Sequence, residues 1–180
     1  DRPNWTYVAA RLFLYDLYHK VNAYTGYGSF AEYLERGEKE GRIVLGLKEK
    51  YDLKDLEAHI KPERDLQVNY LGIKTLHDRY LIKNRQGKPI ELPQHMFMAI
   101  AMFLAQNELN SQDWAKKFYD VISQFEVMLA TPTLSNARTT RHQLSSCYIG
   151  STPDKIEGIV DSYKEMSLLR KDGGGSGWDW

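Results

Sequence analysis

The sequence predicts a mostly α-helical chain that reaches one buried strand near its C-terminal end. Between residues 4 and 128, apolar residues recur at three- and four-residue spacing, which is typical of helices with one buried face. Glycine and proline interrupt this pattern at intervals. One short apolar run, 144–149, has the length of a strand instead, with small residues on one side.

Four helices are predicted in the first half of the chain, each from apolar residues at helical spacing. They cover residues 4–22, 29–41, 47–60 and 65–77. Ser29 is placed to cap the second helix, because its hydroxyl can accept from a free backbone N–H of the first turn. Pro62 separates the third helix from the fourth.

A small β-hairpin is predicted over 80–92, where Gly87 can supply the positive φ of the turn. Pro93 then opens a helix that runs to residue 106 and is expected to be buried, because it is apolar over much of its circumference. Ser111 is predicted to cap the next helix, whose apolar stripe runs as far as Met128.

The C-terminal part is predicted to be less regular. Residues 131–141 are polar and are expected to be irregular, the strand over 144–149 is expected to be buried, and a helix is expected to start at Pro153. The glycine run over 173–177 is most simply a flexible turn after that helix.

Charge and composition exclude several classes of protein. The 180 residues carry 24 Lys+Arg and 24 Asp+Glu, so bulk attraction to nucleic acid or to an anionic membrane is not expected. With 42% hydrophobic residues the chain should form a globular core. It has no signal-peptide pattern and no apolar run near the roughly 20 residues of a membrane span. We therefore expect a cytoplasmic protein, and both ends look like cuts through a longer one.

Cys147 is the single cysteine of the sequence, which excludes an internal disulfide and any zinc site with two cysteine ligands from this chain. A redox role for Cys147 therefore needs a second thiol from elsewhere. The histidines show no metal-ligand spacing, so they are expected to be structural or solvated, and no metal site is predicted. They are His19, His59, His77, His95 and His142.

Three segments combine small hydroxyl or glycine residues with a tight backbone, namely 131–136, 143–147 and 173–177. Hydroxyls and free backbone N–H groups are uncharged donors for a phosphate, so the three segments together are candidates for one anion pocket. The alternatives are ordinary turn and cap chemistry for Thr131 and Ser135, and a small buried apolar side chain for Cys147.

Two arginines close to these segments, Arg138 and Arg141, are most simply solvated loop charges. The alternative is that they raise the positive potential near a bound phosphate.

Taken together in this order, the motifs resemble the large, catalytic subunit of class I ribonucleotide reductase. The matching stretches are YVAARL at 7–12, RYLI at 79–82, PQHMFM at 93–98, TPTLSN at 131–136, QLSSC at 143–147 and GGGSGWDW at 173–180. The resemblance implies a fold that is a mostly α fragment of an α/β protein. On this basis residues 1–142 correspond to a helical N-terminal region, and residues 143–180 to the first strand and helix of an incomplete ten-stranded α/β barrel.

The resemblance also implies roles for single residues. Thr131 and Ser146 match contacts to the substrate diphosphate, and Gly175 matches a glycine whose backbone faces the nucleotide. Cys147 matches one of two cysteines that reduce the ribose 2′ carbon after a thiyl radical has abstracted the 3′-hydrogen, and that end as a disulfide. Asp154 matches a contact to the allosteric effector; the alternative is a favourable charge at a helix start.

The implied enzyme is a ribonucleoside-diphosphate reductase that this chain alone cannot complete, because the second and third cysteines of the family are missing. Its partners would be the complementary part of the large subunit, a second large subunit, and a small subunit that generates the radical at a di-metal centre. Thioredoxin or glutaredoxin would be the reductant, and this chain itself would bind no cofactor. The alternatives are an adenosylcobalamin-dependent reductase and a non-catalytic helical module that binds a nucleotide or a protein.

Overall fold

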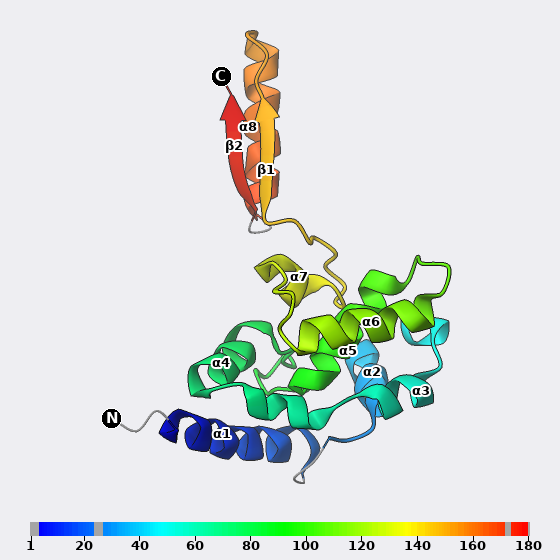
Figure 1. Ribbon diagram of the computed structural model, residues 1–180. Helices are drawn as coiled ribbons and strands as arrows, with labels where there is room; N and C mark the ends of the chain where they lie inside the picture. The colour runs from blue at the N-terminus through cyan, green and yellow to red at the C-terminus, as the bar shows by residue number, and fades with distance from the viewer. Residues whose placement is uncertain (1–3, 24–26, 172–173, 180) are drawn as a thin grey trace.

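The computed structural model describes residues 4–23, 27–171 and 174–179. It shows a helical body from which a βαβ unit projects at the C-terminal end (Figure 1). The α-helices are α1 Trp5–Asn22, α2 Phe30–Lys39, α3 Leu53–His59, α4 Tyr70–Thr75, α5 Pro93–Ala105, α6 Ser111–Ser123, α7 Thr131–Asn136 and α8 Ile156–Lys171. Short turns of other helix types are η1 Lys48–Lys50, η2 Pro62–Gln67 and η3 Leu76–Tyr80, and the strands are β1 Cys147–Ser151 and β2 Gly175–Asp179.

The first two predicted helices are confirmed. The Ser29 hydroxyl accepts from the Glu32 backbone N–H at 3.4 Å and so caps α2. The next two are shorter than predicted, because Asp52 and Asn69 accept from backbone N–H groups and start new helices inside the predicted spans. Local side-chain caps therefore divide this region into short pieces.

The predicted hairpin over 80–92 is a turn without strands. Gly87 has the expected positive φ of 78°, but only an isolated bridge pairs Lys83 with Pro89. Asn84 accepts from the backbone N–H of Lys88 at 2.9 Å, and Pro89 has no N–H to extend a ladder.

The prediction that Pro93 opens a buried helix is confirmed by α5, which lies at the centre of the helical body and packs along α6 (Figure 1). Ser111 does not cap α6 but is its first residue, and α6 ends at Ser123 rather than near Met128 because Phe125 adopts a positive φ of 60°. The segment expected to be irregular contains α7, where Pro132 occupies the first turn.

The βαβ unit differs from its prediction in three ways. The strand begins at Cys147 and is exposed rather than buried, because α8 covers one face of the β1–β2 pair and leaves Ile149 95% exposed on the other. The helix expected from Pro153 begins at Ile156. The glycine run forms β2 rather than a turn, although Gly173 lies outside the described residues.

The two strands run parallel, with Cys147 opposite Gly175 and Ser151 opposite Asp179. Small residues are needed on the face that α8 covers. A Cβ added at Gly150 would lie 2.7 Å from the Trp178 ring. A Cβ added at Gly174 would lie 2.7 Å from the Tyr148 ring. Glycine therefore allows the two aromatic rings to pack close to the backbone. Among the described residues, no helix has the length and apolar character needed to cross a membrane.

A completely buried ion pair joins Arg138 to Glu91, so the prediction of a solvated Arg138 is wrong. The Arg138 Nε donates to Glu91 at 2.7 Å, and Nη2 donates to Glu91 at 2.5 Å and to the Tyr80 carbonyl at 2.8 Å. Nη1 donates to the Leu134 carbonyl at 2.6 Å, and the Tyr33 hydroxyl also donates to Glu91. Because every nitrogen of the guanidinium has an acceptor, these hydrogen bonds offset the cost of burying its charge.

A second buried acid, Asp65, lies between the body's helices. Its carboxylate accepts from the hydroxyls of Tyr18 and Tyr27 and from the Gln94 amide. Burial raises the pKa of Asp65 to about 6, although the three hydrogen bonds act in the opposite direction.

We predict that Glu91→Gln lowers the free energy of unfolding by about 3 to 5 kcal/mol, because it leaves the buried Arg138 guanidinium without a counter-charge. Urea denaturation of the 180-residue chain measures this loss. Lys20→Gln, which breaks the exposed pair with Asp16, is the control and should cost less than about 1 kcal/mol. Equal losses in the two variants would contradict the prediction, and the double variant Glu91→Leu/Arg138→Met should lose less than Glu91→Gln.

We also predict a pH dependence that Asp65 causes. Because its pKa of about 6 in the folded chain exceeds the ordinary 3.8, the folded state binds more protons between these values. The free energy of unfolding should therefore fall as the pH rises from about 4 to about 6, by at most about 3 kcal/mol from this group. Urea titrations of wild type and Asp65→Asn across this range test it, since only the wild type should show this component, and parallel curves would refute it.

Candidate functional site

The structure brings together three of the predicted site residues, Ser146, Cys147 and Gly175. Cys147 and Gly175 begin the paired strands β1 and β2, and the Gly175 N–H donates to the Ser146 carbonyl at 2.8 Å. A Cβ added at Gly175 would lie 3.4 Å from the Ser146 carbonyl oxygen and 3.6 Å from the Cys147 Sγ. The exposed Gly175 backbone therefore lies directly beside the thiol.

The Cys147 thiol is free and lies on the face of the β1–β2 pair that α8 does not cover. Ile149 and Ser151 share this face of β1, and all three residues are exposed. The expectation of a small buried side chain at Cys147 is therefore wrong in this structure. An exposed thiol on an open sheet face is accessible to a second thiol and to a substrate.

Thr131 lies at the start of α7 and is exposed. Its hydroxyl is 3.3 Å from the Tyr80 hydroxyl, and it lines a largely apolar cavity of about 480 Å³ between α4, α6 and α7. Cys147 and Gly175 do not line that cavity. Thr131 and the Cys147 thiol therefore do not meet in that cavity.

The segment between α7 and β1 is nevertheless fixed to α7. The Thr133 hydroxyl donates to the Leu144 carbonyl at 3.3 Å, and the Asn136 amide donates to the Gln143 carbonyl at 2.7 Å. Ser146 follows this segment and is exposed immediately before β1. The start of β1 is consequently the end of the βαβ unit nearest the helical body (Figure 1).

Asp154 lies beyond the opposite end of β1. It is exposed and falls two residues before the first residue of α8, so it does not begin the helix itself. Four steps of about 3.3 Å separate the ends of β1 by roughly 13 Å. Asp154 therefore lies beyond one end of β1, whereas Cys147 lies at the opposite end.

Among the described residues, no group of three or more His, Cys, Asp or Glu side chains could hold a metal ion. The histidines have structural surroundings instead. His95 is buried and stacks on Tyr33 with ring centroids 5.2 Å apart. Burial lowers the pKa of His95 to about 3, and the charge of Arg36 adds to this effect, so the ring is neutral at pH 7.

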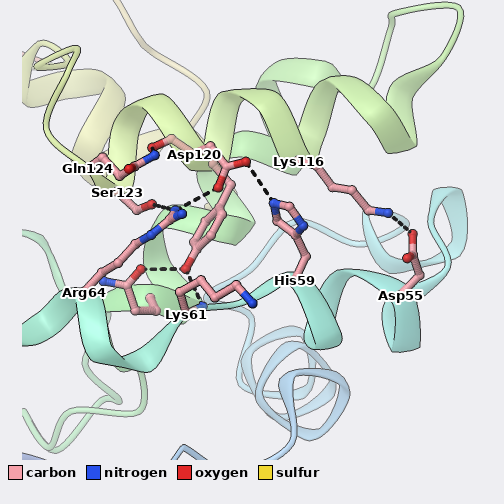
Figure 2. A network of polar contacts seen from close by, with 10 residues as sticks. Asp55, His59, Lys61, Arg64, Lys116, Asp120, Ser123 and Gln124 are labelled. Atoms are coloured by element: carbon pink, nitrogen blue, oxygen red, sulfur yellow. Dashed lines mark hydrogen bonds and ion pairs between the residues drawn. The ribbon is translucent and has the colours of Figure 1, made fainter.

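A polar network joins α3, η2 and α6 (Figure 2). Asp120 accepts from Arg64 at 2.8 Å and lies 3.0 Å from the His59 Nε2, while Arg64 donates to the Ser123 hydroxyl at 2.6 Å. Burial alone would raise the pKa of Asp120, but the hydrogen bonds from Arg64 and His59 hold it below its ordinary value. Ser123 is hydrogen-bonded to Arg64 rather than to His59, so His59 does not activate Ser123 as a nucleophile. The network instead holds α3, η2 and α6 together.

Known proteins match this sequence. A family model described as "Ribonucleotide reductase, all-alpha domain" matches residues 66–142, which lie in the helical body. The "Ribonucleoside-diphosphate reductase subunit alpha" of Helicobacter pylori (strain ATCC 700392 / 26695) is 68% identical over 180 residues, covering 100% of this chain and 23% of that protein.

More distant relatives match over nearly the same extent. The proteins of the same name from Treponema pallidum and Chlamydia trachomatis are each 36% identical, over 98% and 99% of this chain and 22% and 18% of the relatives. The chain spans about a quarter or less of the relatives' length, and the match extends through both the helical body and the βαβ unit. The chain is therefore similar along its whole length to one part of the ribonucleotide reductase large subunit.

Proposed function

We propose that this chain is part of the catalytic subunit of a ribonucleoside-diphosphate reductase, which reduces ribonucleotides to deoxyribonucleotides for DNA synthesis. The observation that carries the proposal is the 68% identity to the Helicobacter pylori subunit across all 180 residues. The open backbone of Gly175 beside the exposed Cys147 thiol supports it, because this chemistry needs a thiol next to a place where the substrate can approach.

The fold of the complete subunit is proposed to be a ten-stranded α/β barrel that β1, α8 and β2 begin. Parallel strands normally have both faces covered, whereas here the face that carries Ile149 is open. Apolar side chains of α8 are exposed as well, among them Ile156 at 74% and Tyr163 at 70%. Exposed apolar surface on a parallel sheet and its helix supports further strands and a second subunit packing against this unit.

Cys147 is proposed to supply one of the two reducing thiols. In the overall reduction the ribose 2′ carbon loses its hydroxyl as water and gains a hydrogen, while two thiols lose two electrons and two protons and form a disulfide. A thiyl radical elsewhere in the subunit abstracts the 3′-hydrogen first and receives it back. The second reducing thiol comes from outside the 180 residues, because they contain one cysteine.

Substrate contacts are proposed for Thr131, Ser146 and Gly175, with the hydroxyls of Thr131 and Ser146 donating to the diphosphate and the Gly175 backbone facing the nucleotide. The hydrogen bonds between α7 and residues 143 and 144 support this. They hold the residues that lead into β1 against the helix that carries Thr131. Asp154 is proposed to contact the effector nucleotide from the far end of β1. Its remoteness from Cys147 suits an allosteric rather than a catalytic contact.

The partners proposed for the assembled enzyme are the rest of the large subunit, a second large subunit and a radical-generating small subunit. The small subunit's di-metal centre supplies the radical, and thioredoxin or glutaredoxin resets the disulfide. A cytoplasmic location is proposed with these partners, since the reductants named here are dithiols that act in a reducing compartment.

In the assembled enzyme, Cys147→Ser should abolish turnover with dithiol reductants, because serine cannot form the disulfide that completes the reduction. The measurement is deoxyribonucleotide formed per enzyme, with Ser145→Ala, an exposed neighbour outside the proposed contacts, as the matched control. Normal turnover by Cys147→Ser would contradict a role for this thiol in the reduction.

The isolated 180-residue chain should reduce no ribonucleotide, whereas its mixture with the complementary part of the subunit and the small subunit should. The reason is the missing second thiol and radical-bearing cysteine. Product formed by the isolated chain would refute the assignment of this chain to one part of the catalytic subunit.

A further inference from the structure

A cleft of about 390 Å³ lies in the helical body where three segments meet, around residues 41–42, 79–83 and 135–141. Its lining contains four cationic side chains and no acidic one. The cations of this cationic cleft are Arg42, Arg79, Lys83 and Arg141. In a chain of zero net charge, such a concentration of one sign is a local feature that needs an explanation.

The positive charge of three side chains of the cationic cleft is not neutralised by an ion pair among the described residues. Arg42, Arg79 and Lys83 form no ion pair there, and the Lys83 ammonium reaches only the Asp78 carbonyl at 3.5 Å. The Asp78 carboxylate is occupied by Lys74 and His77, each at 2.8 Å. The Nε of Arg42 is shielded from solvent and has no hydrogen-bond partner among the described residues. Shielded, unpaired donors of this kind favour an anionic ligand.

The walls of the cationic cleft are fixed before any ligand binds. Ile43 and Thr139 form an antiparallel bridge, and the Val44 N–H donates to the Arg138 carbonyl at 3.1 Å. In addition, the buried Arg138 guanidinium donates to the Tyr80 carbonyl at 2.8 Å. Arg138 or Thr139 therefore holds each of the three segments in place. An anion would bind without the cost of ordering these segments.

We propose that the cationic cleft binds the polyphosphate group of a small molecule. A single phosphate carries a charge of about −1.5 to −2 at pH 7, so two phosphate groups are needed to balance the three unpaired cations Arg42, Arg79 and Lys83. The volume lies within the roughly 300 to 1,000 Å³ of small-molecule pockets, which favours a compact ligand over an extended acidic peptide.

The donors in this site are mainly the cations. The hydroxyls of Ser135 and Thr139 already donate to the carbonyls of Thr131 and Asn136, each at 2.9 Å. The cationic cleft belongs to the helical body, and Cys147 and Gly175 are absent from its lining. Anion binding in the cationic cleft is therefore independent of the proposed reductase chemistry.

Isothermal titration of the 180-residue chain with inorganic tripolyphosphate at low ionic strength tests the proposal. We expect one binding site per chain, weakened about tenfold by Arg79→Gln and about tenfold by Lys83→Gln, because each removes one charge-assisted contact. Arg79 is exposed and Lys83 half-buried, so both variants should fold, as circular dichroism can confirm.

Two controls make the result specific. Lys88→Gln removes an exposed charge from the same turn but outside the lining, and Ser146→Ala alters the proposed substrate site; neither should change tripolyphosphate binding. No binding by the wild type, or equal weakening by Lys88→Gln, would overturn the proposal. A hexaglutamate peptide that competes as strongly as tripolyphosphate would also overturn it and assign the cationic cleft to an acidic protein segment.

Discussion

The fully buried ion pair between Arg138 and Glu91 fixes the geometry of the surface on which both candidate sites depend. Removing two charges from water costs several kcal/mol for each ion, and the cost is recovered only when geometry and hydrogen bonding are complete. Arg138 meets this condition with acceptors at Glu91, Leu134 and Tyr80, and Glu91 also accepts from the Ile82 N–H at 2.8 Å. The pair thereby joins the end of α7 to the turn that follows η3.

The Arg138–Glu91 pair constrains two neighbouring regions of the chain. Toward the C-terminus, α7 carries Thr131 and holds residues 143 and 144, which lead into β1 and Cys147. On the other side, the backbone around Arg138 pairs with residues 43 and 44 and completes the cationic cleft. The helical body contains most of the buried apolar residues, whereas the βαβ unit that it supports has one open face and exposed apolar residues on α8.

The sequence predicts the long elements and misses the features that depend on tertiary contacts. The helices α1 and α5 are predictable because their apolar residues repeat at helical spacing. The burial of Arg138 is not, because a polar loop gives no sign of the distant Glu91 that neutralises it. Likewise, the glycine run predicts a turn from its composition, but pairing with β1 makes it a strand. Residue types also identify Cys147 and Gly175 as candidates, while their adjacency follows from the parallel register alone.

Cys147 is proposed to supply reducing equivalents to a ribonucleotide. Peptide mass spectrometry of the assembled enzyme after a single turnover without external dithiol tests this role. We predict that Cys147 is found in a disulfide in proportion to the deoxyribonucleotide formed, and as a free thiol when the ribonucleoside diphosphate is omitted. Stoichiometric product with Cys147 still a free thiol would contradict it.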